Sequence, residues 1–346
     1  MNYYQEPGGQ SGDTFIHTDG QIEFDQVSNS FYLKKKRPEE EISIRRLGDK
    51  AQRLFLGPGG SREKEWQNVQ TSGGSGEPAV IVHRGKEAEQ IRAQFPNRIL
   101  PTRWHEKWKD MGDEYNNRLT PADLQAEDIP AHLGAKSRWI IQGFHDPDIA
   151  ILNRSVPTPA TSDVPLALQM LASIRAPAWV GDVKSAFTQG LKGQRAERLF
   201  ASAPPGGFPG EDSDVIVELL AEVYGLVTGP PAWRKTLVET FIELGFNNHP
   251  LAPCVALYYE DLGRGKPELS GLVVIETDDL LGGGIGPKFE KAVERLRTKF
   301  VFGKWVHLQE TATEYGGRTL TQRPDGSFTI FHEKIPPRQG PGGPPR

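Results

Sequence analysis

The sequence predicts an α+β fold in which an antiparallel sheet is backed by helices on one face. Two observations predict this class. From about residue 136, apolar runs alternate with tight turns in the order helix, strand, helix, hairpin, helix, hairpin. Acidic residues also stand at the ends of two strand-like runs, Asp182 in GDVKSAF and the pair Asp278 and Asp279 in VVIETDDLLGGG. Neighbouring strands of one sheet can bring these carboxylates to a common edge.

The first elements follow from local spacing. Residues 136–144 (KSRWIIQGF) are predicted to be extended, and a turn-rich connector follows them. A helix is expected to begin near Pro165, a residue that suits a first turn. Its apolar stripe at helical spacing is Leu166, Met170, Leu171 and Ile174.

A strand is predicted next, over residues 178–187. Strand alternation puts Ala178, Val180 and Asp182 on one face. Trp179 lies on the opposite face. The carboxylate of Asp182 therefore ends an otherwise apolar face.

Two more helices are indicated further along. Pro230 and Pro231 open the second helix and Gly245 closes it. The third helix precedes the last hairpin. The apolar stripes are Trp233, Leu237, Phe241 and Leu244 in the second helix, and Phe289, Val293, Leu296 and Phe300 in the third.

Two hairpins complete the predicted domain. Residues 271–276 and 280–281 form the arms of the first, and its turn holds the aspartate pair. The glycines at 282–284 are predicted to be a loop rather than a dinucleotide-binding fingerprint. The last hairpin turns at residues 324–326.

Composition divides the chain into three parts. Its 346 residues include 38 Gly and 28 Pro, too many for a chain that is ordered throughout. Breakers such as GPGGS and TSGGSGEP interrupt residues 1–95, which are predicted to be low-complexity or disordered. Order is expected to begin near Ile99, with a folded domain over residues 96–335 and a disordered tail over residues 336–346.

Charge and cysteine content bound the class of protein. The formal net charge of −4 gives no direct support to nucleic-acid binding. Cys254 is the only cysteine, which excludes a disulfide framework and fits an intracellular setting, cytoplasm or nucleus. The sequence shows neither an apolar run near the roughly 20 residues that span a bilayer nor a signal-peptide core. The protein is therefore predicted not to be secreted and not to have a membrane partner.

A local basic cluster indicates phosphate binding better than the net charge does. Trp104, Trp108 and Trp139 are interleaved with its members. A solvated charged surface is an equally good interpretation of the part before Lys136. The members are Arg92, Arg98, Arg103, Lys107, Lys109, Arg118, Lys136 and Arg138.

The aspartates predict a metal site. Like charges at a sheet edge repel unless a cation neutralises them, and carboxylate oxygens without nearby His or Cys suit Mg²⁺. Two such ions, held roughly 3.5 to 4 Å apart, need carboxylates from more than one strand. Asp182 and Asp278 are the predicted bridging ligands, Asp279 is the supporting member, and Mn²⁺ is the alternative ion. An ordinary turn is the alternative interpretation of an isolated Asp-Asp pair.

Several motifs in a fixed order resemble one family. The chain carries DVKSAF at 182–187, YGLVTGPPAW at 224–233 and ETDDLL at 276–281, flanked by LPTRW, KSRWIIQGF and APPGGFPG. Together they resemble the reverse transcriptase of copia-type LTR retrotransposon Pol polyproteins, over roughly the last two thirds of the chain. The resemblance implies a polymerase palm and fingers, RNA-directed DNA polymerase activity serving DNA integration of a transposable element, and dNTP and an RNA or DNA template–primer as partners. It also makes residues 1–95 a candidate polyprotein linker remnant.

The resemblance assigns further roles by position. The carbonyl of Val183 becomes a metal ligand, and the strand face of Lys136 and Arg138 meets the triphosphate. Phe187 takes the place of an aromatic ring beneath the incoming sugar, where it would collide with a 2′ hydroxyl and favour deoxynucleotides. The alternatives are a core role for Phe187 and an exposed polar strand face for the two cations.

Four other residues receive roles from the same resemblance. Tyr224 and Gly225 lie against the nucleotide and template, where glycine permits close backbone approach. Gly317 occupies the glycine of a primer-gripping hairpin. Lys304 is the candidate acid for protonating pyrophosphate, with a surface lysine as the alternative.

The chain departs from the family pattern near its acidic pair. Glu276 and Thr277 stand where an aromatic residue or His followed by Val is usual, and Val227 stands where Lys is usual. No recognisable ribonuclease H region follows, and these features predict a truncated or decaying element. Two other classes therefore stay open: a catalytically inactive remnant that binds nucleic acid or protein, and a generic metal-dependent nuclease or phosphatase. The oligomeric state is not predicted.

Overall fold

The computed structural model describes residues 20–25, 30–35, 41–110, 133–192, 195–249 and 251–331. The predicted tail over residues 336–346 and Arg118 of the basic cluster lie outside the described residues. In the described part of the chain, no helix combines the length and the apolar character needed to cross a membrane.

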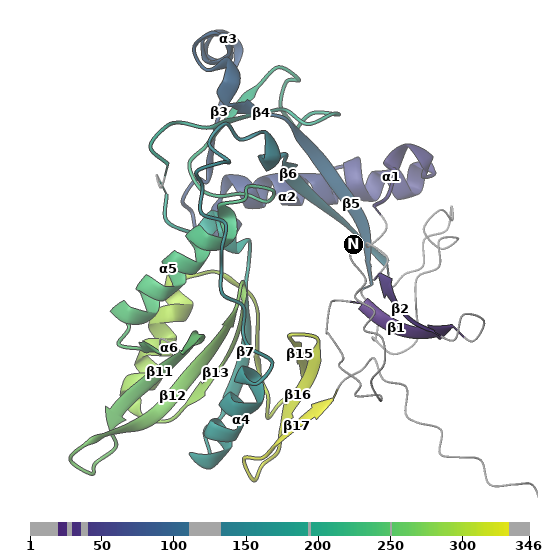
Figure 1. Cartoon of the computed structure of the whole chain (residues 1–346). Coiled ribbons are helices and arrows are strands. Elements are labelled where there is room, and N and C mark those ends of the chain that lie inside the picture. Colours follow the sequence, from purple (N-terminus) through teal and green to yellow (C-terminus); the bar gives the residue numbers. More distant parts are fainter. Residues whose placement is uncertain are drawn as a thin grey trace, which may run out of the picture.

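A six-stranded sheet carries the aspartates (Figure 1). Its strand order is β10-β11-β12-β13-β7-β14, and every neighbouring pair is antiparallel. Together with its helices it confirms the predicted α+β class. The strands are β7 Ala178–Val183, β10 Asn247–His249, β11 Ala252–Asp261, β12 Pro267–Glu276, β13 Asp279–Gly284 and β14 Phe302–His307.

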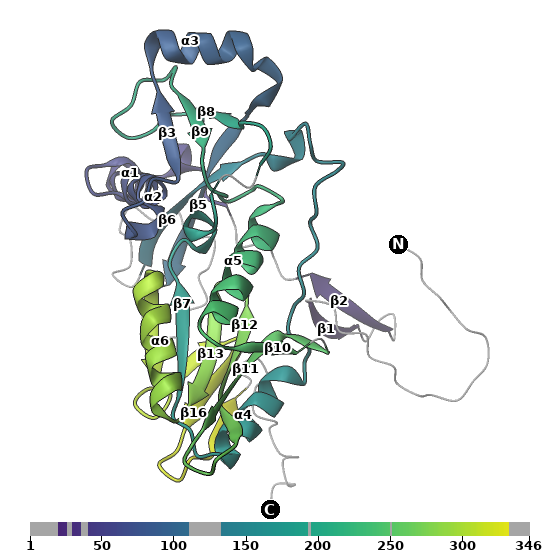
Figure 2. The same ribbon diagram turned by 90° about the vertical axis from the view of Figure 1, so that its left-hand side faces the viewer.

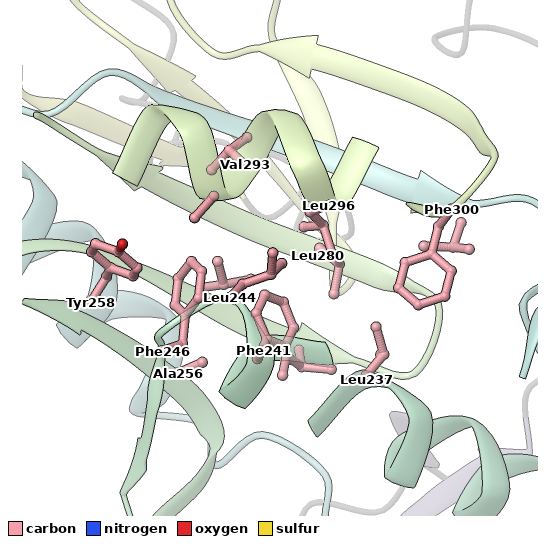
Figure 3. Close-up of a cluster of buried hydrophobic side chains, with 14 of the residues drawn as sticks. Leu237, Phe241, Leu244, Phe246, Ala256, Tyr258, Leu280, Val293, Leu296 and Phe300 are labelled. Carbon is pink, nitrogen blue, oxygen red and sulfur yellow. The ribbon is translucent and has the colours of Figure 1, made fainter. Parts of the chain in front are cut away.

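Helices α5 (Gly229–Glu243) and α6 (Pro287–Lys299) cover one face of this sheet (Figure 1). Each has Pro in its first turn, where a missing N–H loses no helical hydrogen bond. Their apolar sides meet the sheet in a core that includes Trp179 and Val183 of β7. Figure 3 labels ten members of this core: Leu237, Phe241, Leu244, Phe246, Ala256, Tyr258, Leu280, Val293, Leu296 and Phe300.

The opposite face of the sheet is covered too, which corrects the prediction of helices on one face only. Helix α4 (Asp163–Ser173) packs there with Ala178 and Val180 of β7. Leu166 is 59% exposed, because the buried positions of α4 repeat around the opposite side of the helix. A small antiparallel sheet completes this layer with β15 Thr313–Tyr315, β16 Arg318–Gln322 and β17 Phe328–Phe331.

The glycines at 282–284 belong to strand β13, so their prediction as a loop is wrong. Large rings occupy the space beside them. A Cβ on Gly282 would lie 2.4 Å from the Trp179 ring, and one on Gly284 would lie 2.4 Å from the Phe289 ring. The glycines therefore let two large rings of one core pack directly against the backbone of a central strand.

A second part of the molecule lies beyond one end of the six-stranded sheet (Figure 2). It contains a four-stranded sheet in the order β3-β9-β8-β4 and the antiparallel pair β5–β6. Three helices, α1, α2 and α3, accompany these strands (Figure 2). Their bounds are α1 Asp49–Leu56, α2 Ser61–Gln70, β3 Val80–His83, α3 Gly85–Gln94, β4 Ile99–Leu100, β5 Thr102–Asp110, β6 Leu133–Ile141, β8 Phe200–Ser202 and β9 Ile216–Leu219.

Order begins before Ile99, which corrects the predicted start of the folded domain. Strands β1 (Gly20–Asp25) and β2 (Ser30–Lys35) pair antiparallel, and residues 41–95 contain three helices. Helix α2 packs under β6, where the ring of Trp66 meets those of Trp139 and Phe208. Breaker-rich composition misled the prediction because the glycines here connect short helices that bury their apolar sides against later strands.

Candidate active site

A row of charged side chains crosses one face of the six-stranded sheet, and we call it the carboxylate row. Glu276 of β12 is paired in register with Asp279 of β13. Asp182 of β7 is paired with Asp279 on one side and with Lys304 of β14 on the other. Residues directly opposed in antiparallel strands project to the same face, with Cβ atoms roughly 4.5–5.5 Å apart. Three carboxylates therefore stand side by side, with an ammonium group at the end.

Asp278 lies in the tight turn between β12 and β13. Thr277 before it has a φ of 55°, a left-handed conformation that is rare for a β-branched residue. The turn is held from outside by two hydrogen bonds: the Trp233 indole N–H donates to the Thr277 carbonyl (2.8 Å), and the Val183 N–H donates to the Asp278 carbonyl (2.9 Å). Trp233 is thus a core residue, as its place in the apolar stripe predicted, and it also supports this turn. The structure brings the three predicted aspartates together.

Negative charge is in excess along the carboxylate row. Burial raises the pKa of Asp182, and the charge of Asp278 raises it further. Burial, followed by the charges of Asp278 and Asp182, raises the pKa of Asp279 to about 7. Burial also raises the pKa of Glu276. Neighbouring carboxylates resist joint ionisation in this way unless a cation joins them.

A hard divalent cation suits this set of donors. The side-chain donors are carboxylate oxygens, which Mg²⁺ prefers, and the Val183 carbonyl is the additional candidate. Among the described residues, no three or more His, Cys, Asp or Glu side chains form a ready-made cage for an ion. Mg²⁺ in phosphoryl-transfer sites takes part of its coordination from substrate phosphates and water, so a complete protein cage is not required. Asp182, Asp278 and Asp279 are the residues that would hold it.

Strand β6 presents two cations toward the carboxylate row. Lys136 and Arg138 alternate with the buried residues Ser137 and Trp139, as predicted for one strand face. Neither cation forms an ion pair with another described residue. Burial lowers the pKa of Lys136, and the charge of Arg138 lowers it further. Lys136 is also a positive charge that lowers the pKa of Asp182, so the two sites share one electrostatic field.

The loop that carries Tyr224 and Gly225 lies against the end of β6. The Arg138 guanidinium carbon is 4.7 Å from the centre of the Tyr224 ring, and the Ile141 N–H donates to the Tyr224 carbonyl (2.8 Å). Gly225 has a φ of 96°, and a Cβ there would lie 2.0 Å from the Ile141 carbonyl oxygen. Close backbone approach therefore requires glycine at this position.

Phe187 forms the floor of the same region. Its ring meets the Tyr224 ring edge-on, with 5.3 Å between ring centres. The start of α5 packs against this ring, because a Cβ on Gly229 would lie at contact distance, 3.4 Å, from it. The ring is half-buried, so one part packs on the core and another faces the loop.

Glu65 of α2 belongs to this region, although its sequence context did not predict it. The backbone N–H of Trp139 in β6 donates a hydrogen bond to the Glu65 carboxylate oxygen Oε1 (3.4 Å). Burial raises the pKa of Glu65 to about 7, against the lowering effects of that hydrogen bond, Arg138 and Lys136. Only the packing of α2 under β6 reveals its place, because EKEW in a breaker-rich segment carries no chemical signal.

The hairpin of β15 and β16 reaches the opposite end of the carboxylate row. A Cβ on Gly316 would lie 2.7 Å from Glu276 Oε2, whereas Gly317 faces open space at the tip with a φ of 71°. The Lys304 ammonium donates to the hydroxyl of Thr313 in β15. Gly317 and Lys304 thus lie near the carboxylates, one at the hairpin tip and the other in the row.

The described residues of the predicted basic cluster do not form one continuous surface. Three of its arginines are engaged away from the row, whereas Lys107 and Lys109 lie on the β5 strand beside Lys136 of β6. Lys109 is also a positive charge that lowers the pKa of Asp182. The engaged arginines bind Asp148 and Glu197 (Arg98), Glu41 (Arg103) and the carbonyl of Asp214 (Arg92).

Comparisons with known proteins agree with the motifs. Residues 124–326, more than half of the chain, match the family described as reverse transcriptase (RNA-dependent DNA polymerase). A Ty5-1 transposon protein of Saccharomyces cerevisiae is 26% identical over 149 residues, which cover 43% of this chain and 44% of that protein. The chain thus matches less than half the length of this curated relative.

One solved structure is telomerase from Candida albicans in complex with a fragment of telomeric RNA. The alignment covers 77% of this chain and 50% of the telomerase chain, with a TM-score of 0.39 and 7% sequence identity. The family match spans the carboxylate row, the Tyr224–Gly225 loop and the turn of Asp278. The chain belongs to the reverse transcriptase (RNA-dependent DNA polymerase) family, of the copia retrotransposon type that its motifs predicted.

Proposed function

We propose that the chain is an RNA-directed DNA polymerase portion of a retrotransposon protein, which transfers a nucleotide from dNTP to a primer 3′ hydroxyl. One observation carries the proposal: the carboxylate row lies close enough to Lys136 for this cation to lower the pKa of Asp182. Arg138, on the same strand face as Lys136, stacks over the ring of Tyr224. Carboxylates supply the ligands for divalent ions, and the facing cations supply donors for a triphosphate.

Asp182 and Asp278 are assigned as the main metal ligands and Asp279 as the supporting one. When bound, two divalent ions neutralise the developing charge on the phosphate and make the 3′ hydroxyl a better nucleophile. The chain's own part is to hold these carboxylates in place: β7 is fixed by its neighbours on both sides, and Trp233 holds the turn of Asp278. The Val183 carbonyl is proposed as an additional ligand.

The cations of β6 are proposed to bind the triphosphate. Arg138 offers paired donors in a fixed plane, and its stacking over the Tyr224 ring restricts that plane. Lys136 adds a point charge nearer to the carboxylates. Phe187 and Tyr224 form an aromatic floor beneath the sugar, where a 2′ hydroxyl would meet the Phe187 ring. Deoxynucleotides are therefore the proposed substrates.

The far end of the row is proposed to face the primer and the leaving group. Gly317 at the hairpin tip leaves the backbone open to a nucleic-acid strand. Lys304 is proposed as the acid that gives a proton to pyrophosphate. It would have to leave its hydrogen bond with Thr313 to do so.

Primer extension tests the assignment. Asp182→Asn and Asp278→Asn each retain the shape of the side chain and remove its charge, and both should abolish Mg²⁺-dependent extension of an RNA-templated primer. Asp325→Asn is the matched control, because this exposed aspartate only closes the distant turn of β16 and β17. Extension by Asp182→Asn at the wild-type rate would contradict the proposal.

A second candidate is a chain that binds template–primer without catalysis. The carboxylate of Glu276 beside Asp279 favours it, because it adds negative charge next to the proposed metal ligands. Template–primer binding by the wild type, with no incorporation in Mg²⁺ or Mn²⁺, would select this candidate. Release of mononucleotides from a labelled primer would instead indicate a nuclease.

A further inference from the structure

A buried cluster of charged and hydroxyl groups lies behind the Tyr224–Gly225 loop, and we call it the loop clamp. Asp146 is 2% exposed and Glu222 is 6% exposed, so two carboxylates are withdrawn from water. Buried charges of this kind are costly unless they are paired. The proposed chemistry makes no use of any member of the cluster. Its members are Asp146, Arg195, Glu222 and Thr228.

One guanidinium serves both buried carboxylates. Arg195 Nη1 lies 2.8 Å from Asp146 Oδ2, and Arg195 Nε lies 3.9 Å from Glu222 Oε1. Burial raises the pKa of Glu222, while Thr228 and Arg195 lower it and Asp146 raises it. Arg195 therefore ties the connector after β6 to the segment that leads into α5.

The hydroxyl of Thr228 completes the clamp. It accepts a hydrogen bond from Arg195 Nη2 (2.9 Å) and donates one to Glu222 Oε2 (2.6 Å). Thr228 is the residue before α5, where threonine usually accepts a bond from a helix N–H, but its side chain makes no such bond here. A hydroxyl can accept from a cation and donate to a carboxylate at once, which a methyl group cannot do.

The loop clamp joins the two ends of the Tyr224–Gly225 loop, and the neighbouring connector packs against the middle of the loop. Glu222 and Thr228 flank the five residues 223–227, so their side-chain bond joins the two ends of the loop. Asp146 follows Gly143, where a Cβ would lie 2.2 Å from the Gly225 carbonyl oxygen. The loop is thereby held between the connector after β6 and the start of α5.

We propose that Arg195 and Thr228 are positioning residues that keep the Tyr224–Gly225 loop in the conformation that receives the incoming nucleotide. The role toward the nucleotide rests on the proposed function. The structural role of the two residues in holding the loop is independent of the proposed function, because it follows from contacts within the chain.

Three variants test the clamp. Thr228→Val keeps the shape and removes the hydroxyl, whereas Thr228→Ser keeps the hydroxyl. Thr240→Val, within the helix that follows Thr228, is the matched control, because the buried Thr240 hydroxyl makes no hydrogen bond in the described part of the chain. Amide hydrogen exchange over residues 223–227 measures the loop, and primer extension separates KM for dNTP from kcat.

Thr228→Val should speed exchange in the loop and raise KM for dNTP, each by roughly tenfold, because a buried carboxylate loses its donor. Thr228→Ser and Thr240→Val should match the wild type in both. Wild-type exchange in Thr228→Val, or equal impairment of Thr228→Ser, would overturn the clamp. If the wild type extends primers and Thr228→Val keeps its KM, the nucleotide role is overturned. If no protein extends primers, the proposed function fails and the exchange result alone decides the clamp.

Discussion

The carboxylate row and the cluster of Lys136, Arg138 and Tyr224, which we propose binds the nucleotide, are built in different ways. In the row, Asp182, Asp279 and Glu276 lie on adjacent strands whose register fixes their spacing. In the cluster, Arg138 and Tyr224 come from segments far apart in the sequence, joined by one backbone hydrogen bond and one ring contact. Sheet register makes the first region insensitive to distant changes. The second depends on loops and on the packing of α2, so changes remote from the nucleotide should alter substrate binding before they alter the chemical step.

Substitutions in the row and in the adjoining turn of Asp278 should give the largest effects and should be unequal. Asp278→Asn should lower kcat by more than about 10³-fold, because metal stabilisation of the transition state supplies several kcal/mol. Asp279→Asn should lower it by only about tenfold, as expected for a supporting ligand. Single-turnover extension with saturating dNTP measures both. Equal losses would show that the two aspartates share one role.

Trp233→Phe tests whether the turn depends on support from outside the sheet. The ring of phenylalanine keeps most of the packing and removes the N–H that holds the Thr277 carbonyl. A small displacement of a catalytic group costs up to about 10²-fold, so kcat should fall by roughly 10- to 100-fold with KM for dNTP little changed. A rise in KM at constant kcat would instead assign Trp233 to nucleotide binding.

The different construction of the two regions also explains what the sequence predicted. Asp182, Asp278 and Asp279 were found because each ends a strand-like run, and their convergence needs only sheet pairing. Helix α4 was predicted, but its place on the second face of the sheet was missed, because helical periodicity does not say which face a helix covers. The ordered segment before Ile99 was missed because short helices between glycine-rich turns give weak periodic signals. Glu65 was missed for the same reason.

Arg138→Ala tests the cluster directly. Loss of a charge-assisted contact with the triphosphate should raise KM for dNTP by roughly 10- to 100-fold, with a smaller change in kcat. Arg92→Ala is the matched control, since this exposed arginine donates to the Asp214 carbonyl away from the row. The same steady-state assay measures both variants. Similar effects from the two variants would remove the special role of the β6 cations.

Glu65→Gln should have the smallest effect on activity, and its effect on the free energy of unfolding should depend on pH. Burial raises the pKa of Glu65 from 4.5 to about 7, so the folded state holds the proton more tightly than the unfolded state. Stability contributed by the neutral side chain is therefore lost as pH rises from about 4.5 to about 7. The variant stays neutral, so it should match the wild type near pH 4 and exceed its unfolding free energy by roughly 2–3 kcal/mol near pH 8. Urea unfolding at the two pH values measures the difference, and a difference independent of pH would contradict it.

Binding of Mn²⁺ tests most directly whether the row gathers divalent ions. Electron paramagnetic resonance counts bound Mn²⁺ in the presence of template–primer and a non-hydrolysable dNTP analogue, so the measurement does not require turnover. We expect two ions at the wild-type site and the loss of both in Asp182→Asn, because the carboxylate of Asp182 is proposed as a main ligand that would hold them. Equal numbers of ions bound with equal affinity by the wild type and Asp182→Asn would contradict the account.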